Sequence, residues 1–279
     1  MTKSFEDSAL MEWIVKANEK NYLIFFCITS QAQGKIPIEG ISFGMGKSTL
    51  SLWISYLVYK YHLKKKGVNV TSIDGINQVW DIVFQNLFMR PRVYDQYIFR
   101  GPDAPHPPTI LTKHGAIPVI VADDMQETVG KNNRFDPYLQ ALAMRLTKAR
   151  DWVSVVVGTM PKKADLFKWY RDLFTMELII PTRGTFEFQR TIYKKSFRDW
   201  DTVIAKGWYE SEGKKFGFPP LPTVIERRYK KWVRAEQHII DIARWSQDKQ
   251  KPIDEPPVPD SEATIAARAL VNRRWRKDT

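Results

Sequence analysis

Apolar runs alternate with amphipathic stretches along the first two thirds of the chain, and this pattern predicts most of its elements. Apolar positions at helical spacing predict helices over residues 5–20, 49–63, 76–89 and 137–150. Dense or alternating apolar runs predict strands over residues 22–29, 36–41, 68–73, 118–122, 152–157, 178–181 and 185–193. This order indicates an α/β fold, in which a parallel sheet carries helices on both faces.

The pattern changes in the middle of the chain and again near residue 194. Prolines and glycines crowd residues 91–116, which predicts a long loop or insertion. Beyond residue 194 the sequence becomes helical and basic, with a long helix expected over 223–249. The predicted organisation is a core over 1–193, a helical lid-like region over 194–250, a proline-rich linker over 251–260 and a basic C-terminal helix over 261–279.

A glycine-rich segment lies between a predicted strand and a predicted helix, and it carries the strongest chemical signal. Its residues are Gly44, Met45, Gly46, Lys47, Ser48 and Thr49. Glycines let several backbone N–H groups face one phosphate, and the following helix start adds a positive dipole end. In such a loop, Lys47 would reach the β- and γ-phosphates, and the Ser48 hydroxyl would bind Mg²⁺. The expected cofactors are therefore ATP and Mg²⁺.

The loop departs from the usual phosphate-binding pattern in one place. That pattern expects its first glycine at position 41, where this chain has Ile41, and Gly40 comes one residue too early. The strand before the loop and the apolar helix after it are nevertheless the context that a phosphate loop requires.

Two carboxylates follow the buried strand predicted over 118–122. Asp123 is the natural acid for the metal side of the site, and Asp124 is placed to orient or deprotonate an attacking water, with Glu127 as a rival for that role. Thr159 ends the next apolar strand. Its hydroxyl could contact the γ-phosphate or the water, or it could cap the turn that follows.

These residues resemble an ASCE-type P-loop ATPase of the AAA+ branch. Asp123-Asp124-Met125-Gln126 is similar to the Asp-Asp-Ile-Gln form of the Walker B strand in DnaA initiators, and more loosely to DnaC-type helicase loaders. The chain also resembles the DnaA-like ATPases of archaeal viruses and plasmids. The resemblance covers residues 36–190 and implies a P-loop NTPase core with Thr159 as its sensor 1 residue. Asp124 replaces the more common glutamate of the family.

The resemblance also implies a homo-oligomer with shared sites. In that family an arginine from the neighbouring subunit completes each site, and Arg171 and Arg183 are the candidates here. Arg227 or Arg228 could serve as sensor 2, although no motif selects either. A helicase or an initiator protein would be a further partner.

The charge balance adds a polyanionic partner to this picture. Lys and Arg total 43 against 31 Asp and Glu, which gives a net charge of +12. Such a surplus favours nucleic acid or an anionic surface. Basic residues alternate with aromatic ones that could stack on bases, and the DNA-binding candidates are Arg227, Lys230, Lys231, Arg234, Arg273, Arg274 and Arg276. A solvated basic helix face is the alternative.

Several classes of protein are excluded by what the sequence contains. A single cysteine, Cys27, excludes an internal disulfide framework and a cysteine-based zinc site. The N-terminus is polar and acidic, unlike a secretory signal, and the longest apolar run, 23–28, is too short for a membrane span. The expected compartment is the cytoplasm, or the host cytoplasm for a viral or plasmid-borne protein.

Three functions follow from these features. The leading hypothesis is a DNA-associated ATPase that acts in replication initiation or helicase loading. A DNA-translocating or packaging ATPase of the FtsK/HerA kind would use the same site. The third possibility is a nucleotide-switched DNA-binding module with little turnover, which Ile41 and Asp124 make credible.

Overall fold

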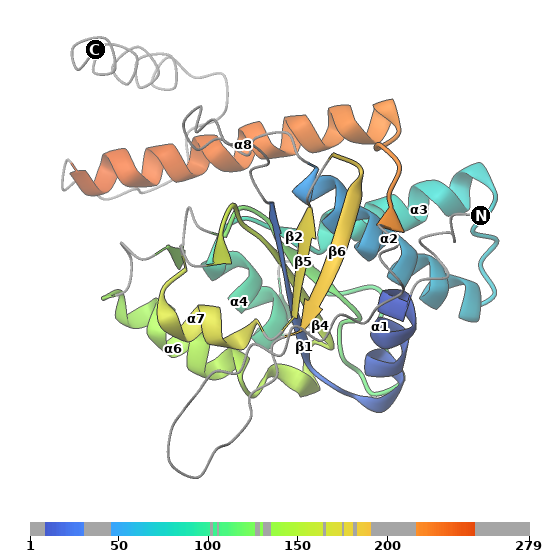
Figure 1. The fold of residues 1–279 in the computed structure, drawn as a ribbon, viewed down its shortest axis with the longest axis horizontal. Helices are drawn as coiled ribbons and strands as arrows, with labels where there is room; N and C mark the ends of the chain where they lie inside the picture. The colour runs from blue at the N-terminus through green and yellow to red at the C-terminus, as the bar shows by residue number, and fades with distance from the viewer. Residues whose placement is uncertain are drawn as a thin grey trace. The chain divides into compact units, whose positions relative to one another are not determined.

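The computed structural model of the protein has an α/β core built around one twisted sheet (Figure 1). It describes residues 9–30, 46–100, 103–104, 106–125, 129–130, 135–163, 166–174, 176–180, 183–190 and 216–248. Contacts divide the chain into two units, Met1–Leu221 and Pro222–Thr279. The first unit contains the sheet, and the second contains the described helix α8, Thr223–Asp248.

Seven strands of the described residues form the sheet in the order β2-β3-β4-β1-β5-β6-β7. Their bounds are β1 Ile24–Ser30, β2 Leu87–Phe88, β3 Ile120–Ala122, β4 Val155–Thr159, β5 Met176–Ile180, β6 Thr185–Arg190 and β7 Phe216–Gly217. Strands β1 to β5 are parallel, whereas β6 and β7 pair antiparallel at one edge. The predicted parallel sheet is therefore confirmed, with an antiparallel addition.

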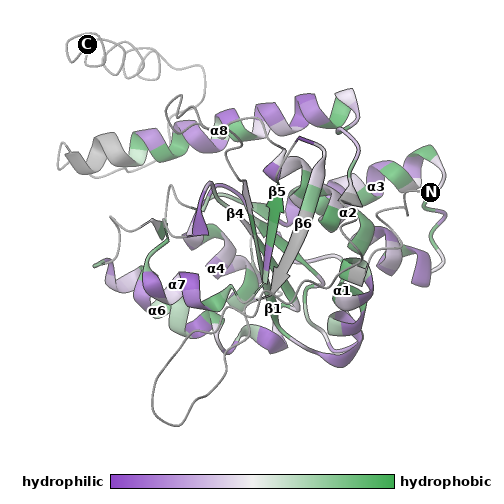
Figure 2. Ribbon diagram, in the orientation of Figure 1, coloured by the Kyte–Doolittle hydropathy of each residue, from purple (hydrophilic) through white to green (hydrophobic). Residues whose placement is uncertain are grey.

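Helices lie on both sides of the sheet, which confirms the second part of the predicted architecture (Figure 1). On one side are α1 Ala9–Lys20, α2 Lys47–Lys65 and α3 Ile73–Gln85. On the other side are α4 Pro91–Arg100, α6 Pro137–Leu146 and α7 Lys168–Leu173. Figure 2 shows β5 coloured hydrophobic along most of its length, as expected for a strand covered on both faces.

Helix α2 is held tightly against the sheet. Leu50, Leu52, Ile54 and Val58 are almost completely buried. Tyr59 is buried in the same helix, and its hydroxyl donates a hydrogen bond of 2.5 Å to the carbonyl oxygen of Val119, just before β3. This packing fixes the position of the first turn of α2 relative to the carboxyl ends of the strands.

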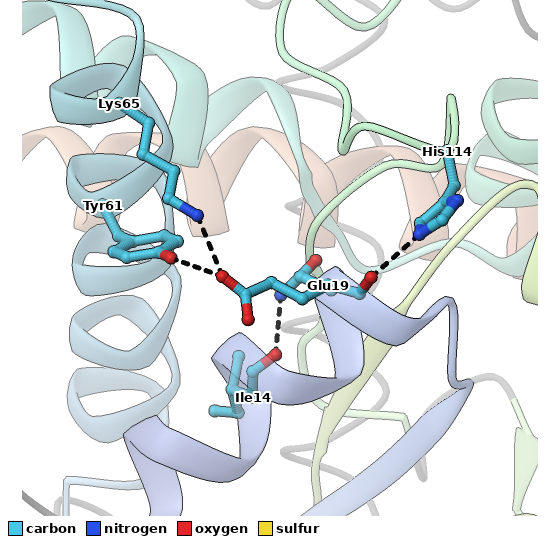
Figure 3. Close-up of polar contacts among 6 residues, drawn as sticks. Ile14, Glu19, Tyr61, Lys65 and His114 are labelled. Atoms are coloured by element: carbon cyan, nitrogen blue, oxygen red, sulfur yellow. Dashed lines mark hydrogen bonds and ion pairs between the residues drawn. The ribbon is translucent and has the colours of Figure 1, made fainter.

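Contacts of Glu19 join α1, α2 and the segment 106–116 (Figure 3). The Glu19 carboxylate accepts hydrogen bonds of 2.9 Å from Tyr61 and from Lys65, and His114 Nε2 donates to its backbone carbonyl at 2.9 Å. Lys65 and Tyr61 together lower the pKa of Glu19. Because Lys65 and Glu19 are largely exposed, their ion pair contributes little to the stability of the fold.

The strand predicted over residues 68–73 is wrong. Asn69 Oδ1 accepts hydrogen bonds from the Thr71 backbone N–H and hydroxyl, and Ser72 Oγ accepts one from the Gly75 N–H at 3.1 Å. These polar side chains make a turn and cap the start of α3. The sheet takes β2 from residues 87–88 instead, which the sequence pattern assigned to the end of a helix.

The loop predicted over residues 91–116 is also wrong at its beginning, where α4 occupies ten residues. Pro91 is the first residue of this helix, and Val93 N–H already bonds to the Arg90 carbonyl at 3.1 Å. Proline fits the first helical position because the N–H that it lacks would have no intrahelical partner there. Residues 106–116 contain no helix or strand, as predicted.

The second unit contains the helix predicted over residues 223–249, which α8 confirms. Hydrophilic and hydrophobic residues are interspersed along α8 (Figure 2). The strand predicted over residues 36–41, the linker 251–260 and the basic helix 261–279 lie outside the described residues, as does the region 194–215.

Candidate nucleotide-binding site

The site begins at the amino end of α2, directly after the glycine-rich segment. Gly46 adopts a left-handed conformation (φ 97°, ψ 20°), and α2 starts at the next residue, Lys47. The Leu50 N–H bonds to the Gly46 carbonyl at 2.9 Å and closes the first turn. The opening N–H groups of a helix have no intrahelical acceptor, so an anion is favoured at this end.

Part of the predicted phosphate loop lies outside the described residues. This applies to Gly44 and Met45, and to Gly40 and Ile41, where the sequence departs from the usual pattern. The described part consists of Gly46 and the first turn of α2, which includes Ser48 and Thr49.

The structure brings the hydroxyl groups of two predicted site residues to one carboxylate oxygen of a third. Ser48 Oγ donates to Asp123 Oδ1 at 2.9 Å, and Thr159 Oγ1 donates to the same oxygen at 2.5 Å. Asp123 and Thr159 are nearly fully buried, at 1% and 2% exposure. A buried carboxylate needs such donors, because an unpaired charge would be costly in this environment.

The strand order explains why residues so distant in sequence meet. Strand β4 lies between β3 and β1, and Ala122 pairs with Gly158, which in turn pairs with Cys27. Asp123 directly follows β3 and Thr159 is the last residue of β4, so both lie at the edge of the sheet where these adjacent parallel strands end. Helix α2 follows β1 in the chain and brings Ser48 to that edge.

Thr159 also fixes the backbone after β3. Its hydroxyl accepts a hydrogen bond of 2.8 Å from the Asp124 N–H, and its carbonyl accepts one of 3.0 Å from the Met125 N–H. Asp124 has a positive φ of 50°, which is uncommon for a residue with a side chain. Thr159 thus caps the turn that carries the two acids, rather than the turn that follows β4.

The negative charges of Asp123 and Asp124 act on the ammonium group of Lys47. Burial lowers the pKa of its ammonium group, while the charges of Asp124 and, to a smaller extent, Asp123 raise it. A partly desolvated ammonium group next to a helix start is well placed for an anionic ligand.

Ser48 and Asp123 could together hold a magnesium ion. A serine hydroxyl and a carboxylate are hard oxygen donors, and Mg²⁺ commonly takes few protein ligands and keeps several waters. Among the described residues there is no group of three or more His, Cys, Asp or Glu side chains able to hold a metal ion.

Gly158 belongs to the site although the sequence analysis did not select it. A Cβ at this position would lie 2.5 Å from Met125 Sδ and 2.8 Å from Phe174 Cζ. A glycine is therefore required beside Thr159 so that the turn after β3 can pack against β4. The need for glycine at this position is visible only in the three-dimensional contacts. In sequence alone, a glycine inside a strand can equally mark a bulge or a tight bend.

The remaining candidates lie elsewhere. Glu127 is outside the described residues. Arg171 lies in α7, and Arg183 is exposed in the turn before β6. Neither arginine therefore lies on α2, β3 or β4, the elements that bring Ser48, Asp123 and Thr159 together. Their role as arginine fingers depends on a neighbouring subunit and stays a prediction.

The basic candidates on α8 form an exposed stripe within the second unit. Arg227, Lys230, Lys231 and Arg234 are all exposed, and Lys230 pairs with Glu226 at 2.7 Å. Tyr229 and Trp232 stack with ring centroids 6.1 Å apart. Arg273, Arg274 and Arg276 lie outside the described residues.

No helix in the described part of the chain has both the length and the apolar character needed to cross a membrane. Comparisons of the chain with protein-family models, with curated proteins and with solved structures find no match.

Proposed function

We propose that the protein binds ATP with Mg²⁺ at the amino end of α2 and hydrolyses it. The observation that carries this proposal is the shared oxygen of Asp123, which accepts hydrogen bonds from Ser48 and Thr159. The P-loop ATPase resemblance requires three parts. They are a serine after a Gly-Lys pair, a buried acid at the end of a strand, and a polar residue at the end of the neighbouring strand.

Each residue has a distinct task in this proposal. Lys47 and the first N–H groups of α2 would bind the phosphates, and Ser48 and Asp123 would hold Mg²⁺, which neutralises charge on the phosphates. Asp124, with Glu127 as the alternative, would accept a proton from the water that attacks the γ-phosphorus. The bond to the bridging oxygen then breaks and ADP leaves.

We further propose a role on DNA, in replication initiation or helicase loading. The net charge of +12 and the exposed basic stripe on α8 support a nucleic-acid partner. The resemblance to AAA+ initiators and loaders supports a homo-oligomer in which Arg171 or Arg183 completes a neighbouring site.

A nucleotide-switched DNA-binding module with little turnover is the second candidate. The favouring observation is Asp124, an aspartate where the family more often has glutamate, whose backbone is held in a left-handed conformation by Thr159. A shorter acid tied to the turn would act less effectively as a base, so ATP would assemble the protein without rapid hydrolysis.

The experiment measures ATP hydrolysis with and without single- and double-stranded DNA at two salt concentrations. The variants are Lys47→Ala and, as a matched control, Lys64→Ala, which removes an exposed lysine near the other end of α2. DNA-stimulated turnover in the parent and in Lys64→Ala, absent in Lys47→Ala, is expected. Binding without turnover would favour the switch, processive movement on duplex DNA would favour a translocating motor, and equal rates in all three proteins would refute the site.

A further inference from the structure

A short segment that begins with β7 lies against the start of α2. This strap, residues 216–221, is held to the turn before β6 by the Phe218 N–H, which donates to the Gly184 carbonyl at 2.8 Å. The Phe218 side chain is only 7% exposed, and its ring centroid lies 6.4 Å from that of Phe186. The strap therefore belongs to the same unit as the sheet, although residues 191–215 before it are not described.

The ring of Phe218 rests on the backbone of Gly46. A Cβ on Gly46 would lie 3.1 Å and 3.2 Å from two carbons of this ring, which is closer than ordinary van der Waals contact. Gly46 also has φ 97°, a conformation that side chains rarely adopt. The positive φ favours glycine immediately before Lys47, and a side chain there would also press on the strap.

A second anchor joins the strap to α2 beyond its first turn. Trp53 Nε1 donates a hydrogen bond of 2.9 Å to the Pro219 carbonyl. The indole is itself held by Tyr56 and Trp80, with ring centroids 5.3 Å and 5.5 Å away. The strap is therefore tied to rigid points on α2, and its prolines limit how far it can bend.

We propose that Phe218 is a positioning residue for the Gly46–Lys47 peptide at the start of α2, and that nucleotide binding and the packing of the strap against Gly46 are linked. This inference rests on the proposed function, because it assumes that phosphates bind beside Gly46. The Gly46–Lys47 peptide must present its N–H to a phosphate, and the ring of Phe218, which lies against Gly46, limits how that peptide can move. Since linkage is reciprocal, a ligand that orders Gly46 also stabilises the strap, which leads within two residues into α8.

The test compares ATP affinity in the full-length parent, Phe218→Ala, Phe218→Leu and a stability control, Ile98→Ala. Ile98 is a 1% exposed residue of α4, which lies on the other side of the sheet from α2 (Figure 1). Phe218→Ala should weaken ATP binding about tenfold. Phe218→Leu should recover part of that loss, and Ile98→Ala should bind as the parent does while it lowers the melting temperature.

Amide hydrogen exchange distinguishes a positioning role for Phe218 from a purely structural one, because a purely structural role would not make exchange in the strap respond to ATP. ATP should slow exchange at the Phe218 amide in the parent, and it should have no such effect in Lys47→Ala. If the parent binds ATP but Phe218→Ala binds it equally well, or if exchange in the strap does not respond, the inference is overturned and the proposed function stands. If the parent binds no ATP, the proposed function fails first and this inference with it.

Discussion

At the scale of single residues, the site depends on how one carboxylate oxygen is satisfied. Asp123 Oδ1 accepts hydrogen bonds from two hydroxyl groups contributed by different elements, α2 and β4. The positions of both donors are set by the packing of α2 and β4, so the fold itself organises the metal side of the proposed site. Such preorganisation removes part of the cost of ordering the site when a ligand binds.

The Thr159→Val variant should show what the Thr159 hydroxyl contributes to stability, to hydrolysis and to ATP affinity. The change removes the hydroxyl that donates to Asp123 and accepts from the Asp124 N–H, so both groups lose a buried partner. We expect the free energy of unfolding to fall by about 1–3 kcal/mol and hydrolysis to fall more than ATP affinity. Denaturant titration and steady-state kinetics measure the two effects. Thr159→Ser, which keeps the hydroxyl, should restore both, and a fully active Thr159→Val protein would contradict the assignment.

The pH dependence of ATP binding should follow Lys47. Burial holds the pKa of Lys47 below its ordinary value of 10.5, and a bound triphosphate would favour the charged form and raise it. Affinity should therefore be constant while Lys47 is protonated, and then fall by up to about tenfold per pH unit as the pH rises through the lowered pKa. Titration calorimetry between pH 7 and 10 measures this slope. Lys47→Arg should lack the slope because arginine does not titrate there, and an equal slope in both proteins would contradict the role of Lys47.

At the scale of elements, the central buried strands and most of the helices, but not α4, were predictable from sequence. Strands β1, β3 and β4 are buried on both faces, so their apolar runs are unambiguous. Strand β2 has only two residues and could not be distinguished from the end of the preceding helix. The segment 68–73 has strand-like residues, but local hydrogen bonds of Asn69 and Ser72 decide its conformation.

Ser72→Ala should show that this segment is a helix cap. The variant loses the acceptor for the Gly75 N–H at the start of α3. The expected cost is about 1 kcal/mol of unfolding free energy, with no effect on nucleotide affinity. Thermal or denaturant unfolding of the variant beside Ser72→Asp, which keeps a capping oxygen, measures it. Unchanged stability in Ser72→Ala would mean that the cap does not contribute.

Part of the candidate site could be predicted from sequence, and part of it could not. Ser48, Asp123 and Thr159 were selected because their residue types stand at strand ends or after a glycine loop, and the fold brings them together. Phe218 could not be selected, because its contact with Gly46 joins segments separated by most of the chain. Contacts of this kind depend on the packing of side chains, which has no local signature in sequence.

At the scale of the whole molecule, the lone cysteine offers a probe of ligand-linked stability. Cys27 is fully buried in the central strand β1, and burial raises the pKa of its thiol, so it should not react in the folded protein. ATP and Mg²⁺ at 100 times their dissociation constant should slow thiol labelling in mild denaturant about 100-fold. Lys47→Ala should show no such protection. Rapid labelling of the native parent would mean that β1 opens locally.

The central claim is that Lys47, Ser48 and Asp123 bind Mg-ATP, and titration calorimetry of ATP with Mg²⁺ and with EDTA tests it most directly. The proteins to compare are the parent, Lys47→Ala and Asp123→Asn. We expect the parent to bind ATP more tightly with Mg²⁺, Asp123→Asn to lose this dependence on Mg²⁺, and Lys47→Ala to lose most of the affinity. A parent protein that binds no ATP, or a Lys47→Ala variant that binds it as tightly as the parent, would contradict the account.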